Sequence, residues 1–235
     1  MAKKKAVCLI SGGLDSCVSA YTAKDENFDI YSLTIDYGQQ HIKEIECAKM
    51  ISSELNSKQH IILKVNLNIF GGSTLFNGNF IDEKKSIEDI GKKIPSTYVP
   101  ARNTILLSLA LGYAESINAN SIYIGVTSTD YSGYPDCRPE YIKLFQKLAN
   151  IATKKSIENG KIIIKAPLIN LSKADIISKG YHLDVPFYNT WSCYKGDNKP
   201  CGICDSCLLR LKGFKDSNLK DPLDYNELPD WYLNK

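Results

Sequence analysis

The chain has 235 residues, of which 43% are hydrophobic and 23% are charged, and its formal net charge is +3. This composition is typical of a globular protein with enough apolar material for a core, and it lacks the strongly basic character of a dedicated nucleic-acid binder. No apolar run approaches the roughly 20 residues of a membrane span, and residues 1–5 carry no signal-peptide cleavage pattern, so we expect a cytoplasmic protein with no membrane or nucleic-acid partner.

Strand-like and helix-like segments alternate along most of the chain. Five apolar runs predict strands, at 6–10, 30–35, 60–65, 121–126 and 161–166. Between them lie segments compatible with helices, at 15–24, 41–55, 103–117 and 139–155, the third with an apolar stripe at helical spacing. The alternation predicts an α/β fold with a doubly wound, mostly parallel five-stranded sheet that is buried on both faces.

Two glycines join the first strand to the first helix, in the string Ser11-Gly12-Gly13-Leu14-Asp15-Ser16. A strand that turns into a helix start through glycines leaves several backbone N–H groups unpaired and pointing at one spot, which attracts phosphate. Ser11 and Ser16 add hydroxyl donors, and Asp15 can hold a magnesium ion against a pyrophosphate. We therefore interpret this string as a phosphate-binding loop; the alternative is an ordinary glycine turn.

Residues 66–97 interrupt the alternation, because they are rich in Gly, Asn, Ser and Lys and show little periodicity. A stretch this long inside a compact domain is either disordered or a functional flap. We expect a mobile flap near the ligand, since the segment leads directly into the next polar motif.

Further polar strings, at 36–41, 95–103 and 127–138, follow predicted strands or lie at the end of the long insertion. Ligands of open α/β sheets bind outside the carboxyl ends of the strands, so we expect these strings to converge with the glycine loop into one active site. Arg102 would face the phosphate region, while Asn103 or Thr104 can cap the helix that follows. A solvated cap is the alternative.

The string 129–138 holds two carboxylates, two phenols and a guanidinium around a turn. Its tyrosine rings could clamp a flat heterocycle, and Arg138 could take a substrate carboxylate with two hydrogen bonds. A surface loop with half-buried tyrosines is the other interpretation.

A short helix is predicted over 171–180, with Ser172 as its N-cap, Asp175 completing a box-like arrangement and Gly180 as a left-handed stop. His182 follows it and is interpreted as a surface or core histidine.

Four cysteines lie close together near the end of the chain, at Cys193, Cys201, Cys204 and Cys207. Zinc binds four such thiolates tetrahedrally, and a closed set of four indicates a structural site with no open position for water. Redox disulfides are the alternative. We expect residues 1–185 to form the nucleotide-binding and catalytic domain, and residues 186–235 to form a helical and loop region around the zinc site.

Together these strings resemble one family, the 7-cyano-7-deazaguanine synthases of queuosine-precursor biosynthesis, which belong to the ATP pyrophosphatase (PP-loop) superfamily. The matching strings are SGGLDS, DYGQQH, PSTYVPARN, TDYSGYPDCR, APLINLSKADI and SCYKGDNKPCGICDSCLLR, in the family's order from residue 6 to residue 214. The resemblance implies a ligase that converts 7-carboxy-7-deazaguanine and ammonia to the nitrile while two ATP become two AMP and two diphosphate, through an acyl-adenylate and an amide.

The resemblance also implies roles for individual residues. Asp15, Ser16 and Arg102 would be catalytic, with Mg²⁺ accompanying ATP and Arg102 neutralising charge. ATP would lie against the loop and the start of its helix, that is Ile10, Ser11, Gly12, Gly13, Leu14, Asp15, Ser16, Cys17, Val18, Ser19 and Ala20. The deazapurine would lie against Asp130, Tyr134, Asp136 and Arg138, and the four cysteines would hold one structural zinc ion.

Two positions depart from the family's pattern: Gln40 stands where Arg is common, and Ala101 stands where Gly is common. The first removes a possible cation, and the second requires residue 101 to avoid a glycine-only conformation. Two other functions stay open, a PP-loop tRNA-modifying enzyme of the thiolase or lysidine synthase type and a non-enzymatic adenine-nucleotide sensor. We expect a homodimer.

Overall fold

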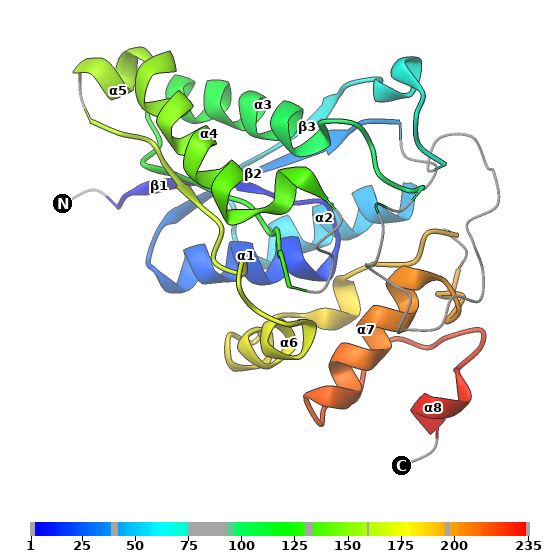
Figure 1. Ribbon diagram of the computed structural model, residues 1–235. Coiled ribbons are helices and arrows are strands. Elements are labelled where there is room, and N and C mark those ends of the chain that lie inside the picture. Colours follow the sequence, from blue (N-terminus) through cyan, green and yellow to red (C-terminus); the bar gives the residue numbers. More distant parts are fainter. Residues whose placement is uncertain are drawn as a thin grey trace.

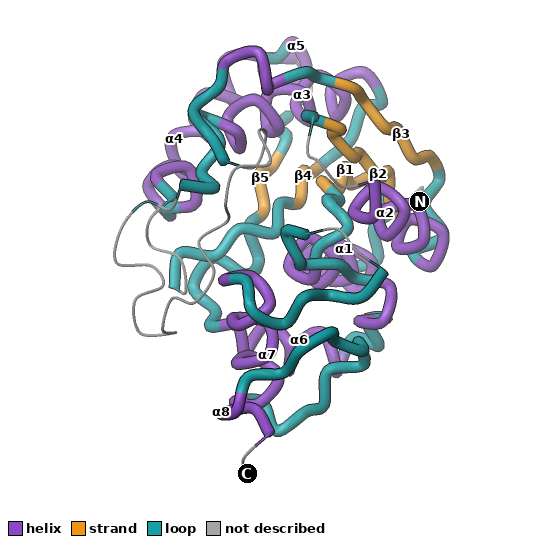
Figure 2. The backbone as a smooth tube through the Cα atoms, turned by 90° about the vertical axis from the view of Figure 1, so that its right-hand side faces the viewer, coloured by secondary structure: helices purple, strands orange, loops and turns teal. Residues whose placement is uncertain are grey.

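Five parallel strands form the centre of the computed structural model and confirm the predicted sheet. The structure describes residues 3–38, 42–74, 94, 96–129, 134–158, 160–195 and 198–233. The strands are β1 (Lys5–Leu9), β2 (Asp29–Asp36), β3 (Gln59–Lys64), β4 (Ser121–Tyr123) and β5 (Ile163–Lys165). They lie in the order β3-β2-β1-β4-β5, which Figure 2 shows along the sheet, and every pairing is parallel.

Helices cover both faces of this sheet (Figure 1). One face carries α3 (Arg102–Ser116), α4 (Pro139–Ala152) and the short α5 (Lys154–Glu158). The other carries α1 (Leu14–Asp25), α2 (Ile42–Glu54) and α6 (Lys173–His182), and α7 (Asp205–Asp216) packs against α6. Shorter turns of helix are η1 (Leu67–Phe70), η3 (Pro135–Cys137), η4 (Phe187–Asn189) and α8 (Asp230–Leu233).

The central strand explains why both layers are needed. Along β1, Val7 and Leu9 point into the core beneath α3 and α4, while Ala6 and Cys8 point into the core beneath α1 and α6. All four side chains are buried. Because side chains alternate across a strand, a nearly continuous apolar run requires an apolar layer on each face. None of the helices within the described residues is long and apolar enough to cross a membrane.

Two helix boundaries differ from the sequence prediction. The predicted capping box at Ser172 and Asp175 is present, but α6 continues through Gly180 to His182, and the left-handed residue is Asp184. Gly180 is needed for packing instead, because a Cβ there would lie 2.5 Å from the Phe187 ring. The predicted helix 139–155 divides at Thr153, whose hydroxyl accepts a hydrogen bond from the Ser156 N–H at 3.2 Å.

The start of α3 has a left-handed residue and corrects the expectation for its cap. Ala101, its N-cap residue, has φ 51° and ψ 25°, the left-handed conformation that favours glycine. Neither Asn103 nor Thr104 caps the helix. The Asp136 carboxylate accepts a hydrogen bond from the Asn103 N–H at 2.9 Å, and the Asn103 side chain donates to the Asp136 carbonyl oxygen and contacts the Cys137 sulfur.

Replacing Ala101 with glycine is expected to raise the free energy of unfolding by about 0.5–1 kcal/mol. The left-handed conformation costs an L-residue roughly 1–2 kcal/mol, and the greater freedom of glycine in the unfolded chain offsets part of that gain. Urea denaturation measures the change in the free energy of unfolding, provided that this free energy depends equally steeply on urea concentration in both proteins. Ser108→Gly, an exposed position within α3, is the control and should instead destabilise the protein by a few tenths of a kcal/mol to about 1 kcal/mol. A lower free energy of unfolding in Ala101→Gly would contradict the claim that the backbone of residue 101 is strained.

Candidate functional site

The glycine loop is closed on itself by its two serines. The Ser11 hydroxyl donates to the Ser16 hydroxyl at 3.0 Å and accepts a hydrogen bond from the Gly13 N–H at 3.2 Å. The Ser16 hydroxyl donates to the Gly13 carbonyl oxygen at 2.9 Å. Helix α1 then starts at Leu14 with Gly13 as its N-cap and no side-chain cap. Its first N–H groups therefore remain available to an anion.

Two glycines allow the loop to pack closely against its neighbours. Gly12 has φ 88°, and a Cβ there would lie 2.0 Å from the carbonyl oxygen of Glu44 on α2. At Gly125, after β4, a Cβ would lie 2.7 Å from the backbone of Asp15. The Trp191 N–H donates to the Gly12 carbonyl oxygen at 2.9 Å, which ties the loop to the C-terminal part of the chain. The loop is thus held from three sides.

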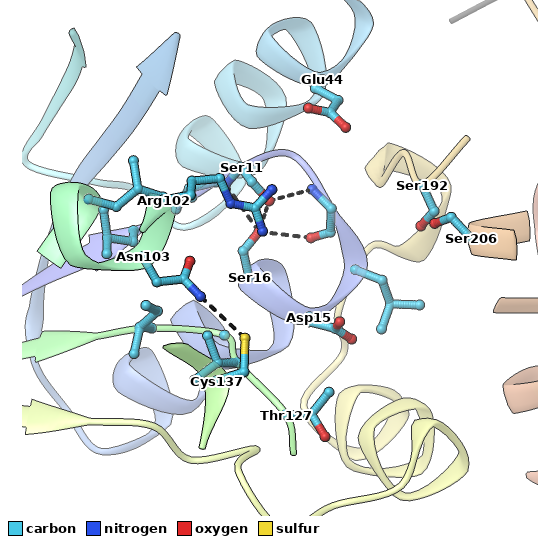
Figure 3. A pocket seen from close by; sticks show the side chains of 18 of the residues that line it. Ser11, Asp15, Ser16, Glu44, Arg102, Asn103, Thr127, Cys137, Ser192 and Ser206 are labelled. Atoms are coloured by element: carbon cyan, nitrogen blue, oxygen red, sulfur yellow. Dashed lines mark hydrogen bonds between the residues drawn. The ribbon is translucent and has the colours of Figure 1, made fainter. Parts of the chain in front are cut away.

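A cavity of about 300 Å³ opens in front of this loop, at the carboxyl ends of β1, β2 and β4 (Figure 3). Of the residues predicted for ATP, Ile10, Ser11, Gly13, Leu14, Asp15 and Ser16 line it. Gly12 packs behind the loop against α2. Four others are buried in α1, among the core beneath it, and do not line the cavity: Cys17, Val18, Ser19 and Ala20.

An ion pair joins the loop to α6. The Lys173 ammonium lies 2.7 and 2.8 Å from the two carboxylate oxygens of Asp15, and both residues line the cavity. Lys173 was not among the predicted site residues, although it belongs to the string LSKAD that supported the resemblance. The signal available in the sequence was that Lys173 stands at the first position of a capped helix. Its contact with Asp15 could not be predicted, because 158 positions separate the two residues.

Arg102 lines the cavity from the first turn of α3, as predicted. Its guanidinium lies 5.8 Å from the centre of the Tyr37 ring and donates to the Tyr37 hydroxyl at 3.5 Å. Glu44, from the first turn of α2, lines the same cavity and was missed by sequence reasoning. Figure 3 shows Glu44 and Asp15 on opposite sides of the glycine loop.

The four residues predicted to hold the deazapurine lie in different places. Tyr134 lines the cavity, and its ring packs at 5.7 Å from that of Tyr98. Asp136 is buried, and its carboxylate is engaged at the start of α3. Arg138 is exposed at the start of α4 and does not line the cavity. Asp130, Gln40 and most of the predicted flap 66–97 lie outside the described residues.

The four clustered cysteines meet in space. Their sulfur atoms all lie within 4.8 Å of one another, and all four side chains are buried. The Sγ atoms of Cys201 and Cys207 are 3.9 Å apart, and the Cys201 N–H donates to the Cys193 sulfur at 3.3 Å. Sulfurs around one tetrahedral ion with bonds of about 2.3 Å would stand a little under 4 Å apart, so the cluster fits a four-thiolate metal site.

The chain around these cysteines forms one wall of the cavity. Ser192 and Tyr194 flank Cys193, Ser206 precedes Cys207, and all three line the cavity. Arg210, one helical turn further along α7, also lines it. The four-cysteine segment therefore forms part of the cavity wall, which sequence reasoning did not predict.

Arg210 is held by a buried hydrogen-bond network. Its Nε and Nη2 atoms donate to the two carboxylate oxygens of Asp221 at 2.7 and 3.0 Å. Its Nη1 donates to the Thr190 hydroxyl at 2.7 Å, and Nη2 also donates to the Phe187 carbonyl oxygen at 3.1 Å. The Tyr225 hydroxyl donates to Asp221 at 2.7 Å. The network joins η4, α7 and the C-terminal segment behind the cavity wall.

The arrangement suits a polyanionic ligand. Open N–H groups, one lysine and two arginines line a cavity that also holds two carboxylates, so it offers both anion binding and a place for a divalent cation.

Comparisons with known proteins found matches along nearly the whole chain. A family model described as Queuosine biosynthesis protein QueC matches residues 5–218. A 7-cyano-7-deazaguanine synthase of Syntrophus aciditrophicus is 51% identical over 223 residues, which are 94% of this chain and 96% of that protein. One of Saccharophagus degradans is 49% identical over 96% of this chain and 99% of that protein. A solved structure of NMN synthetase from Francisella tularensis matches with a TM-score of 0.43 and 22% identity over 85% of this chain and 67% of that one.

Proposed function

We propose, from the premise that this chain belongs to the QueC family of queuosine biosynthesis proteins, that it is an ATP-dependent carbon–nitrogen ligase. It converts 7-carboxy-7-deazaguanine and ammonia to 7-cyano-7-deazaguanine, and two ATP become two AMP and two diphosphate. The observation that carries the proposal is the cavity in which the glycine loop, Asp15, Lys173 and Arg102 meet.

The chemistry needs this kind of cavity. A carboxylate is a poor electrophile, so its oxygen must first be adenylated, after which ammonia displaces AMP and leaves an amide. A second adenylation, on the amide oxygen, lets AMP depart as the nitrile forms. The protein's main task is to position two anions and to stabilise the departing pyrophosphate with fixed positive groups. The N–H groups of the loop, Ser11 and Ser16 bind pyrophosphate, and Lys173 and Arg102 neutralise its charge.

Two metals complete the proposal. Asp15 holds Mg²⁺, which neutralises the phosphates of ATP when it is bound. The four-cysteine cluster holds one zinc ion with a structural role, since four thiolates leave no position for water or substrate.

Substrate recognition is assigned to the segment from Asp130 to Arg138. Tyr134 contacts the deazapurine from the cavity wall, Asp136 orients the start of α3, and Asp130 and Arg138 supply polar contacts. The cavity position of Tyr134 supports this assignment, while the hydrogen bond from the Asn103 N–H to the Asp136 carboxylate supports only the role of Asp136 at the start of α3.

Arg138 lies outside the cavity lining, so its proposed contact requires the substrate carboxylate to extend beyond the cavity toward the start of α4. With that contact, replacing Arg138 with alanine is expected to raise the KM for the carboxylate substrate by about 10-fold or more, because a charge-assisted hydrogen bond contributes about 1.5–3 kcal/mol. The KM for ATP and the KM for the amide, which lacks the carboxylate, should change little. Steady-state kinetics with each substrate measures the difference. Lys143→Ala, on the same helix, is the control. Equal increases in all three KM values would contradict the contact.

The assembly and location of the protein are also proposed. Helix α4 and the segment after it expose Leu144, Leu148, Ile151 and Ile157, and we assign this apolar face to a homodimer interface. The eight cysteines are free in the structure, which supports the reducing cytoplasm as its location. The net charge of +3 supports small-molecule substrates without a nucleic-acid partner.

The test is a direct assay. The purified protein is incubated with 7-carboxy-7-deazaguanine, ammonium, Mg²⁺ and ATP, and the products are identified by mass spectrometry. The nitrile and AMP are expected in a ratio of one to two. Release of ADP, absence of the nitrile, or ATP consumption that requires tRNA would contradict the proposal.

A further inference from the structure

Glu44 is a carboxylate in the cavity that the roles assigned so far leave unused. Among the described residues that line the cavity, the acidic ones are Asp15 and Glu44. Asp15 is paired with Lys173 at 2.7 Å. Within the described parts of the chain, the Glu44 carboxylate has neither a hydrogen bond nor an ion pair of its own. A glutamate that lacks a structural partner and faces a ligand cavity is a candidate for proton transfer.

The position of Glu44 is fixed relative to the glycine loop. Its carbonyl oxygen occupies the space where a Gly12 Cβ would stand, so the first turn of α2 rests directly on the loop. Figure 3 shows the Glu44 side chain on the side of the loop opposite Asp15. The positive charge of Arg102 on α3 acts on the Glu44 carboxyl. The start of α2 that carries Glu44 therefore has a fixed position relative to any phosphate that the loop binds.

Its surroundings allow Glu44 to change protonation state near neutral pH. Burial raises the pKa of the Glu44 carboxyl to about 7, and the positive charge of Arg102 opposes that increase only in part. The neighbouring phenols of Tyr37, Tyr134 and Tyr194 have pKa values raised by burial, so they are neutral at this pH. Asp15 is compensated by Lys173. A base whose pKa lies near the working pH transfers protons most efficiently.

The proposed reaction has a nitrogen that must lose protons. We propose, as an inference that rests on the proposed function, that Glu44 is the general base that accepts these protons from the reacting nitrogen. The cavity places this carboxylate beside the phosphate loop and opposite Arg102, so one group can serve both halves of the reaction.

The steps balance as follows. Ammonia uses its lone pair to form the C–N bond, the C–O bond to AMP breaks with its electron pair leaving on AMP, and the nitrogen gives one proton to Glu44. In the second half the amide oxygen forms a bond to the α-phosphorus of ATP, pyrophosphate leaves, and the nitrogen loses its second proton. When the C–O bond to the second AMP breaks, the nitrogen loses its last proton and the C≡N bond is complete. Glu44 releases each proton to solvent before it accepts the next.

The test separates adenylation from proton transfer. Glu44→Gln keeps the size of the side chain but cannot accept a proton. Starting from the amide avoids the ionisation of ammonium, so nitrile formation from amide and ATP is measured against pH. In the unsubstituted protein the rate should fall as the pH drops below about 7, because the protonated carboxyl is no longer a base. In Glu44→Gln the rate should be lower by about 10²- to 10⁴-fold, and this decline should disappear.

Adenylation itself is followed by exchange of labelled pyrophosphate into ATP with the carboxylate substrate and no ammonia. This exchange should stay within a few-fold of the unsubstituted protein in Glu44→Gln. Glu46→Gln, an exposed position on the same helix that pairs with Lys43 at 3.9 Å, is the matched control and should change neither rate.

The possible results are distinguishable. If the unsubstituted protein makes no nitrile, the proposed function fails. If it makes nitrile and Glu44→Gln does so at a similar rate, or if pyrophosphate exchange falls as much as nitrile formation, the general-base role is overturned. A lowered melting temperature with an unchanged pH profile would also overturn it, because that result indicates a structural role at the start of α2.

Discussion

Replacing Arg210 with alanine is expected to lower the free energy of unfolding by about 3–5 kcal/mol. The side chains of Arg210 and Asp221 are 2% and 1% exposed, and the substitution leaves the Asp221 carboxylate buried without its cation. Removal of one partner of a buried ion pair costs this much because the remaining charge is desolvated and uncompensated. The hydrogen bonds to Thr190 and Phe187 are lost as well. Urea denaturation, with the slope held comparable, measures the difference.

Two further variants make this prediction specific. Lys212→Ala, on the same helix, removes an exposed ion pair with Asp216 and should cost less than about 1 kcal/mol. The double variant Arg210→Met with Asp221→Leu removes both charges together and should be more stable than Arg210→Ala. A cost below about 1 kcal/mol for Arg210→Ala would show that water reaches Asp221 and that the network is not buried in solution.

Loss of the metal is expected to destabilise the C-terminal region and to weaken ATP binding. Cys207→Ser removes one of four thiolates, and because metal binding contributes folding free energy, we expect the loss of about one equivalent of zinc and several kcal/mol of stability. The KM for ATP should rise about 10-fold or more, since a wall displaced by about 1 Å can cost this much in binding and rate. Elemental analysis measures the zinc content, hydrogen exchange of residues 186–233 measures the stability of the region, and steady-state kinetics measures the KM for ATP.

Cys47→Ser is the matched control for the metal experiment. Cys47 is buried and packs against the same cluster, but it does not belong to the group of four sulfurs. The Cys47→Ser protein should therefore retain about one equivalent of zinc. Zinc-free protein with unchanged exchange in residues 186–233 would contradict the structural role of the metal, and a Cys207→Ser protein with a full equivalent of zinc would contradict the ligand set.

Periodicity and turn chemistry predicted the sheet well. The strands lie within a few residues of their predicted positions because each is a short apolar run between polar turns. Burial on both faces, which was predicted for the whole sheet, fails at the edge strand β3, where most side chains are partly or fully exposed. The glycine loop and the four cysteines were predictable for a related reason, since each places its functional groups within a few residues of one another. Local patterns of this kind do not depend on how the rest of the chain folds.

What the sequence did not reveal depends on long-range contacts. Lys173 contacts Asp15 across 158 positions of the sequence. The helical pattern around Arg210 predicts only whether its side chain lies on an apolar or a polar face of the helix, and not that it binds Thr190. Glu44 resembles any acidic residue in the first turn of a helix until α2 is placed on the loop. The left-handed conformation of Ala101 could not be predicted, because a residue type does not report the backbone dihedral that its neighbours impose.

The wall formed by Ser192, Tyr194 and Ser206 has a consequence for how the protein is made. As the chain leaves the ribosome, the whole sheet and the glycine loop are present long before this wall is synthesised. The hydrogen bond from the Trp191 N–H to the Gly12 carbonyl oxygen then joins this C-terminal part of the chain to the glycine loop. A chain that lacks this segment therefore lacks one wall of the cavity, and the cavity is complete only once that segment has folded.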